Sequence, residues 1–182
     1  AGKASLSGSA FDFLADFADA LADFVNGIVH SGTGLALLVG KNSPAASIAD
    51  IDLPGKTLAV RQGTTGEVWA RANIKKAQIL ALEKESAAVL EVVQGKADAF
   101  LYDQMSIWKN AQEQPEKTRA LLAPVRKEQW AVALRQNDTV LLEQINAFLK
   151  NFRAAGGFET LGNKYLGDQK AAFREQGIEF YF

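Results

Sequence analysis

Two stretches of the chain carry groups suited to charged ligands, and each follows a predicted buried strand. In residues 52–67 (DLPGKTLAVRQGTTGE), a strand over Thr57–Arg61 leads through a Gly-Thr-Thr corner into a helix. The start of a helix presents free backbone N–H groups at its positive end, so Gly63–Thr65, with two hydroxyls, fits a phosphate or a carboxylate. A second strand, Ala97–Tyr102, is followed directly by the carboxylate of Asp103. An anion site and an acid at two strand ends suit the two charged ends of a zwitterion such as an amino acid.

Both groups also have a structural interpretation. Threonine and aspartate are common helix N-caps, so Thr64 and Asp103 could each cap the helix that follows. Arg61, Glu67 and Asp103 are the groups that could serve as acids or bases in an enzyme, but carboxylates at such corners are more often caps and ligand clamps. We therefore expect no catalytic residues and no enzymatic activity.

Composition narrows the possible functions. The 182 residues suffice for one domain or two small lobes, and a hydrophobic content of 48% with 23% charged residues is ordinary for a soluble globular protein. The net charge is −1 with Lys and Arg scattered, so we expect no nucleic-acid partner. The chain has no cysteine and one histidine, His30, which excludes disulfides, cysteine nucleophiles and a His-pair metal site. We expect neither a metal nor a cofactor.

The start of the chain suggests a processed product. It begins at Ala1 and contains a single methionine, Met105, so we expect any export signal to have been removed already. No apolar run reaches membrane-spanning length.

Strands and helices alternate through the middle of the chain. Strands are predicted at Leu35–Val39, Thr57–Arg61, Gln78–Leu82 and Ala97–Tyr102, and helices at Thr65–Ala72, Ser86–Val93 and Gln104–Glu113. One or two helical turns are predicted over Glu116–Leu121, with further strand at Val125 and Gln129–Leu134. Such alternation favours βαβ units and a mainly parallel sheet, with ligands at the carboxyl ends of the strands, where Thr64 and Asp103 both fall.

The flanking segments are mainly helical in pattern. Residues 11–29 have apolar side chains at helical spacing, although the segment 11–16 also fits a strand. From Asn137 an amphipathic helix runs to Gly156, and two short helices, Phe158–Tyr165 and Gln169–Gln176, follow. The apolar end, Ile178–Phe182, is expected to pack against another part of the molecule.

An ordered series of motifs along about residues 23–167 resembles the family 3 extracytoplasmic solute-binding proteins, the polar-amino-acid receptors of ABC importers. The motifs are Ser31–Asn42, Ile48–Lys56, Ala59–Glu67, Val93–Ala99 with Asp103, Trp130–Arg135, Leu142–Asn146 and Gly157–Tyr165.

The resemblance implies an α/β fold of the periplasmic-binding-protein-like type II, with two lobes joined by crossover strands and ligand held between them. Lobe 2 would span residues 40–134, and a reduced lobe 1 would combine residues 1–39 and 135–182. The ligand α-carboxylate would bind at Gly63, Thr64, Thr65 and Gly66, and its α-ammonium at Asp103, while Arg61 would line the pocket.

The chain departs from the family pattern in the first lobe. The strand, helix, strand and helix that open this lobe in the family have no counterpart, so the chain is expected to be N-terminally incomplete. The family's carboxylate-clasping arginine is also missing, since the corresponding segment, Asp19–Ala22, contains none.

The function implied by the resemblance is extracytoplasmic binding of a small polar or charged amino acid for delivery to the membrane permease of an ABC importer. The protein would be a monomer, exported to the periplasm or the cell exterior with or without a lipid anchor. The alternative is a ligand-sensing or accessory domain of a membrane-bound signalling protein.

Overall fold

The structure is a computed structural model that describes residues 32–129, 134–135, 137–178 and 180. Three predictions fall on residues that the structure does not describe. They concern the helix within residues 11–29, the segment Asp19–Ala22 that lacks the arginine of the family, and most of the strand predicted at Gln129–Leu134. The described chain falls into two units, one of residues 32–129 with those from Gly156 onward and another within residues 134–155.

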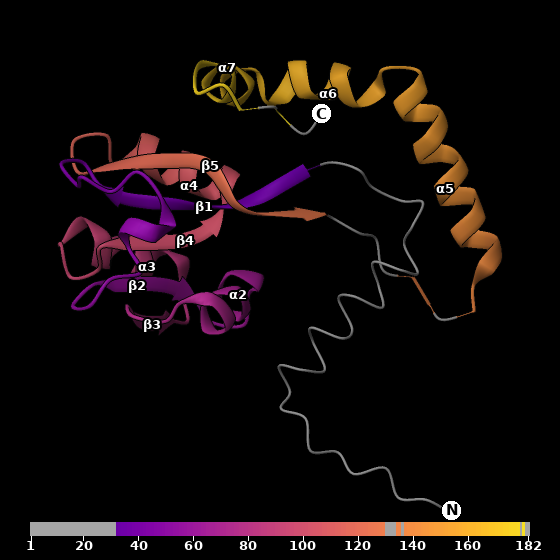
Figure 1. The fold of residues 1–182 in the computed structure, drawn as a ribbon. Helices are drawn as coiled ribbons and strands as arrows, with labels where there is room; N and C mark the ends of the chain where they lie inside the picture. Colours follow the sequence, from indigo (N-terminus) through magenta and orange to yellow (C-terminus); the bar gives the residue numbers. More distant parts are fainter. Residues whose placement is uncertain (1–31, 130–133, 136, 179, 181–182) are drawn as a thin grey trace, which may run out of the picture. The chain divides into compact units, whose positions relative to one another are not determined.

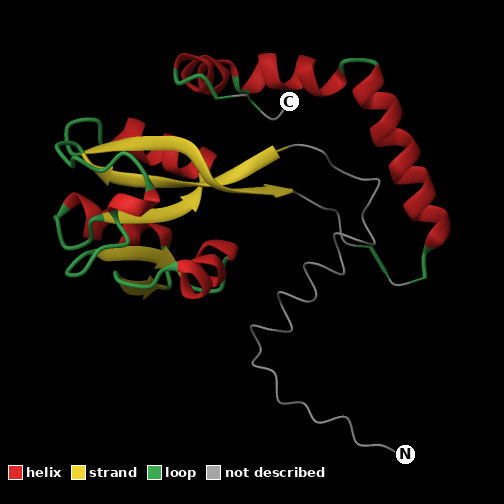
Figure 2. Cartoon of the chain, in the orientation of Figure 1, coloured by secondary structure: helices red, strands yellow, loops and turns green. Residues whose placement is uncertain are grey.

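The first unit is built on one five-stranded sheet with the strand order β3-β2-β4-β1-β5 (Figures 1 and 2). The strands are β1 (Gly32–Gly40), β2 (Thr57–Arg61), β3 (Gln78–Leu82), β4 (Ala99–Asp103) and β5 (Thr118–Gln129). β2 lies between β3 and β4 and is parallel to both, as βαβ connections require. β1 is antiparallel to both β4 and β5. The prediction of a mainly parallel sheet was therefore wrong for the two pairings that β1 makes. These pairings are antiparallel because β1 and β5 lie outside the two βαβ units.

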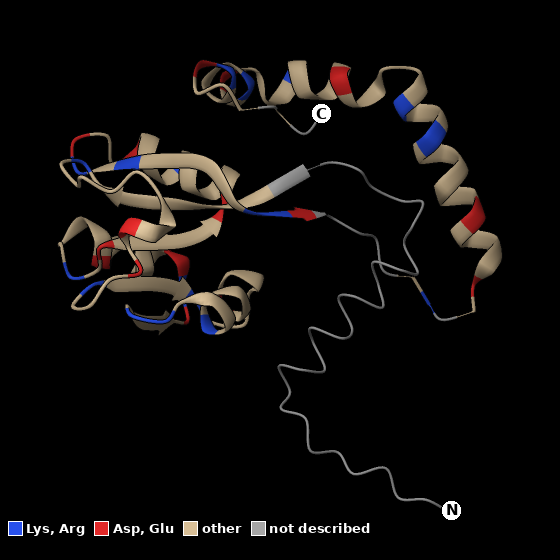
Figure 3. Ribbon diagram, in the orientation of Figure 1, with Lys and Arg blue, Asp and Glu red and all other residues tan. Residues whose placement is uncertain are grey.

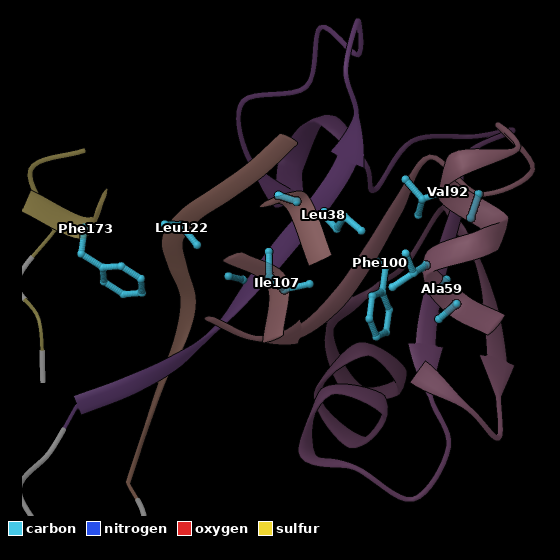
Figure 4. Close-up of a cluster of buried hydrophobic side chains, with 12 residues drawn as sticks. Leu38, Ala59, Val92, Phe100, Ile107, Leu122 and Phe173 are labelled. Atoms are coloured by element: carbon cyan, nitrogen blue, oxygen red, sulfur yellow. The ribbon is translucent and has the colours of Figure 1, made fainter. Parts of the chain in front are cut away.

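Helices cover both faces of the sheet. α2 (Thr65–Asn73), α3 (Glu85–Val93) and α4 (Gln104–Glu113) follow β2, β3 and β4 in turn, and a 3-10 turn spans Ile48–Asp50. Successive strand residues point to opposite faces, so each strand contributes to two cores. One core joins Leu38, Ala59 and Phe100 to Val92 of α3 and Ile107 of α4 (Figure 4). The other joins Leu37, Val60 and Leu101 to Ala70 and Ile74 of α2.

The segment predicted as one or two helical turns, Glu116–Leu121, is largely strand, and this prediction was wrong. Residues from Thr118 pair with β1, with Thr118 opposite Gly40 and Leu121 opposite Leu37. This long-range pairing overrides the local helical pattern.

Three helices follow, close to the predicted bounds: α5 (Thr139–Ala154), α6 (Gly157–Tyr165) and α7 (Gly167–Glu175). Phe173 of α7 is fully buried in the same core as Leu122, and its ring meets that of Phe180 edge to face at 5.2 Å. Ile178 also packs against this core, so the part of the apolar end that is described packs as predicted. Among the described residues, no helix combines the length and apolar character needed to cross a membrane.

The lobe boundaries stay a prediction. β1 is hydrogen-bonded in the sheet up to its end at Gly40, so the boundary predicted between residues 39 and 40 falls at the last residue of a central strand.

Candidate functional site

The ends of β2 and β4 bring the two predicted halves of the site to one edge of the sheet. Val60 pairs with Leu101, and one residue further along Arg61 Nη1 donates to the Tyr102 hydroxyl over 2.7 Å. The start of α2 lies directly on β4, because a Cβ atom added to Gly66 would sit 3.1 Å from the Leu101 carbonyl oxygen. Asp103 ends the same strand two residues later. The fold therefore places the Gly-Thr-Thr corner beside the strand that ends in the acid.

The corner leaves the first turn of α2 without a bond from its N-cap side chain. Gly63 has a φ of +74°, a left-handed conformation that glycine adopts without strain. Thr64 occupies the N-cap position with extended backbone, but its hydroxyl donates to the Arg61 carbonyl over 2.7 Å and makes no capping bond. The prediction that the Thr64 side chain caps α2 was therefore wrong. Amide groups at a helix start that lack a side-chain partner are suited to an anion.

Glu67, a possible acid or base in the sequence, has a structural role in this corner that was not predicted. Its side chain is 2% exposed. One carboxylate oxygen accepts the Gly63 N–H at 2.7 Å, and the other accepts Nε and Nη2 of Arg71 at 2.9 and 2.7 Å. Because both oxygens are engaged, Glu67 supports the backbone of the corner and is poorly placed for proton transfer. The spacing 63, 67, 71, one helical turn per step, was the available signal.

Asp103 caps α4, as its structural interpretation predicts. Its Oδ1 accepts the Ser106 N–H at 2.9 Å. An ionised carboxylate offers about four lone-pair positions, so this one bond leaves acceptor capacity for a ligand. The next residue, Gln104, is buried and donates to the Leu122 carbonyl at 2.7 Å, which ties the start of α4 to β5.

Arg61 is held by an aromatic neighbour. Its guanidinium carbon lies 5.9 Å from the centroid of the Tyr102 ring, which stacks on Phe100 at 5.3 Å. The hydrogen bond to Tyr102 and then the electrostatic interaction with Tyr102 raise the pKa of Arg61 above its ordinary value, with a smaller contribution from the charge of Glu85. Arg61 and Tyr102 share a face because they occupy equivalent positions on paired strands. No local pattern in the sequence indicates this contact.

Charge elsewhere on the described chain is mixed. Basic and acidic residues are interspersed along the helices and loops (Figure 3). Within the part of the chain that the structure covers, no group of three or more His, Cys, Asp or Glu side chains is arranged to hold a metal ion.

Comparison with known proteins shows which proteins this chain resembles. No family model matches the chain. The ABC transporter glutamine-binding protein GlnH of Bacillus subtilis (strain 168) is 27% identical over 144 residues, which cover 79% of this chain and 52% of GlnH. The L-cystine-binding protein TcyJ of Escherichia coli (strain K12) is 26% identical over 139 residues, 74% of this chain and 51% of TcyJ. A shorter match of 70 residues, 37% identical, links 38% of this chain to 26% of a cyclohexadienyl dehydratase of Pseudomonas aeruginosa.

Solved structures that are similar to this chain include further binding proteins. The P235GK mutant of ArgBP from T. maritima matches with a TM-score of 0.64 and 28% identity over 75% of this chain and 58% of that one. A putative binding component of an ABC transporter from Wolinella succinogenes, complexed with lysine, matches with a TM-score of 0.62 and 29% identity over 73% and 58%.

The fold is thus α/β of the periplasmic-binding-protein-like type, and the resemblance to the family 3 solute-binding proteins is confirmed at partial coverage. The chain spans about half the length of the curated relatives it matches, with 52% of GlnH and 51% of TcyJ. The ligand-binding roles of Arg61, Gly63–Gly66 and Asp103 stay predictions.

Proposed function

We propose that the chain binds a small polar or charged amino acid outside the cytoplasm and delivers it to the membrane permease of an ABC importer. The observation that carries this proposal is the pairing at one sheet edge of a helix start without a side-chain cap, at Thr64, and a carboxylate with spare acceptor capacity, at Asp103. The names of GlnH and TcyJ, an ABC transporter glutamine-binding protein and an L-cystine-binding protein, support this class of ligand and partner.

Each half of the edge suits one end of the ligand. The α-carboxylate would accept from the first amides of α2 at Thr64–Gly66, where the partial positive charge of the helix favours an anion. The α-ammonium would donate to Asp103. Bonds that join two ionised groups are short and about twice as strong as neutral ones, so this arrangement selects amino acids by their backbone atoms. Arg61, beside the corner, would contact the ligand side chain.

The proposed partner follows from the name of GlnH, an ABC transporter binding protein. The proposed location is the periplasm or the cell exterior, with or without a lipid anchor, and the proposed state is a monomer. Closure of two lobes around the ligand would give the permease a shape to recognise.

Enzymatic activity is disfavoured by the contacts of the candidate acid–base groups. Glu67 is bound at both oxygens and Arg61 is bonded to Tyr102, so Asp103 would lack a second acid–base group beside it that is free to react. The dehydratase relative corresponds to this chain over only 26% of its length. A signalling role has no comparable support, since the names of GlnH and TcyJ point to binding for transport.

Isothermal titration of the chain with the standard amino acids and cystine tests the proposal. Asp103→Asn is the informative variant, because asparagine is as good an N-cap as aspartate and removes only the charge. We expect it to keep the stability of α4 and to lower affinity by about tenfold or more, equal to ~1.4 kcal/mol.

Asp138→Asn is the matched control, since Asp138 caps α5 through the Leu141 N–H at 3.2 Å and lies far along the chain from the site residues. It should leave affinity unchanged. Equal affinity in Asp103→Asn and the parent would remove Asp103 from the site, and the absence of binding to every amino acid would overturn the proposed function.

A further inference from the structure

We propose that Glu67 and Arg71 form a charge-neutral latch under the Gly63–Gly66 corner, in which Glu67 fixes the backbone and Arg71 cancels its charge so that the corner can accept an anion. This inference rests on the proposed function, because it assigns both residues to the carboxylate-binding half of that site. They are positioning residues and do not themselves touch the ligand.

The first part of the latch is the bond from Glu67 to the backbone. In a capping box, an acid at the third helical position accepts the N–H of the N-cap residue. Glu67 holds that third position in α2, yet it accepts the N–H of Gly63, the residue before the N-cap Thr64. The amide of Thr64 is left out of this bond. Glu67 thereby fixes the left-handed turn at Gly63, whose φ is +74°, without occupying the amides proposed for the ligand.

The second part is the charge. A buried carboxylate one helical turn from an anion site would repel the ligand carboxylate, and it would be costly to bury alone. Arg71 offsets this charge with two hydrogen bonds to Glu67 Oε1, at 2.9 and 2.7 Å. Arg71 lies at the surface and Glu67 beneath it, since the Arg71 side chain is 51% exposed and that of Glu67 is 2% exposed. The pair therefore gives the corner a buried acceptor with little net charge.

All the contacts of the latch are local to α2 and the residue that precedes its cap. Gly63, Glu67 and Arg71 follow one another at intervals of four residues, and the three side-chain bonds connect only these residues. The latch is thus complete without ligand, so the corner is set before an amino acid arrives.

A double substitution separates the latch from a merely structural role. Arg71→Gln leaves the Glu67 charge unbalanced beside the site, and we expect amino-acid affinity to fall by about tenfold. Glu67→Gln/Arg71→Gln removes that charge while the amide oxygen at position 67 can still accept the Gly63 N–H, so affinity should return to within about threefold of the parent. If the pair served stability alone, the double variant would bind no better than Arg71→Gln.

Asn73→Ala is the matched control on the same helix. It removes the bond from Asn73 Nδ2 to the Trp69 carbonyl at 2.8 Å, which lies at the other end of α2. We expect its affinity to equal that of the parent. A loss equal to that of Arg71→Gln would overturn the latch, because any weakening of α2 would then have the same effect.

Hydrogen exchange of the Gly63 amide in the ligand-free chain tests the latch independently of binding. Glu67→Leu should speed this exchange by about tenfold or more, equal to the loss of ~1.4 kcal/mol of protection, whereas Glu67→Gln should keep most of it. If Glu67→Leu does not fold, Glu67→Asp takes its place, since its shorter side chain cannot reach both Gly63 and Arg71. Unchanged exchange would overturn the latch. If the parent chain binds no amino acid but Glu67→Leu speeds exchange of the Gly63 amide, the proposed function is overturned and the latch is supported.

Discussion

Arg61 and Tyr102 join the ends of two parallel strands through a hydrogen bond of 2.7 Å between Arg61 Nη1 and the Tyr102 hydroxyl. Arg61 ends β2, just before the Gly-Thr-Thr corner, and Tyr102 precedes Asp103 at the end of β4. The bond therefore ties together the two strand ends that carry the two halves of the proposed site.

Loss of this bond should weaken the ligand site. Tyr102→Phe keeps the ring on Phe100 and removes only the hydroxyl, so Arg61 is free to move away from β4. We expect amino-acid affinity to fall by about threefold to tenfold, the range that one hydrogen bond contributes, as measured by isothermal titration. Tyr165→Phe, at a residue of α6 that is 65% exposed, is the control and should bind as the parent does. Equal affinities for the two variants would contradict the role of the bond.

A side chain at Gly66 should destabilise the corner. An added Cβ would lie 3.1 Å from the Leu101 carbonyl oxygen, a backbone atom held in the sheet. Overpacking costs about 1–3 kcal/mol, and the better helix propensity of alanine returns about 0.5–1 kcal/mol. We expect Gly66→Ala to lower the free energy of unfolding in urea by about 1 kcal/mol. Gly40→Ala, which meets no atom within 4 Å, is the control. A Gly66→Ala chain as stable as Gly40→Ala would contradict a close contact between Gly66 and the Leu101 carbonyl.

Acid should destabilise the fold partly through Asp52. Its carboxylate accepts the N–H groups of Lys75, Lys76 and Ala77 at 3.0, 2.7 and 3.0 Å. The bond from Ala77, then that from Lys76, hold the pKa of Asp52 below its ordinary value. Because the folded pKa is the lower one, this stabilisation is fully present above the unfolded pKa of about 3.9 and is lost as pH falls through the folded value.

Urea unfolding between neutral pH and about pH 2 measures this loss. Asp52→Asn should be less stable than the parent at neutral pH and should lose less stability on acidification. Glu116→Gln, at an exposed residue in the turn before β5, is the control and should follow the parent. An Asp52→Asn profile parallel to that of the parent would contradict the assignment.

Local sequence signals predicted much of the first unit. The bounds of β2, β3 and α4 agree with the predictions, because short apolar runs are interrupted there by turn residues such as Pro54-Gly55 and by the cap Asp103. Strand pairing was harder. The antiparallel pairing of β1 with β4 and with the strand that begins at Thr118 joins residues far apart in the sequence, such as Val39 with Ala99 and Gly40 with Thr118, and such contacts leave no local pattern.

The sequence predicted that the candidate site residues lie at one edge of the sheet, but it did not predict their hydrogen bonds. The rule that ligands bind at the carboxyl ends of parallel strands brought the corner and Asp103 together, as the structure does. It did not predict that the Thr64 hydroxyl donates to the Arg61 carbonyl or that Glu67 accepts the Gly63 N–H. Each group has alternative hydrogen-bonding partners of similar strength, and the sequence pattern does not select among them. The Arg61–Tyr102 contact spans 41 residues of sequence and follows only from the strand register.

The most direct test of the amino-acid site is an NMR titration of the uniformly ¹⁵N-labelled chain with the tightest-binding amino acid, its N-acetyl derivative and its carboxamide. The free amino acid should shift the amide signals of Thr64, Thr65 and Gly66 and those beside Asp103 with a single affinity. The N-acetyl derivative lacks the ammonium group and the carboxamide lacks the carboxylate, so each should bind at least about tenfold more weakly. Saturating shifts confined to other residues, or equal binding of all three compounds, would contradict the proposed site.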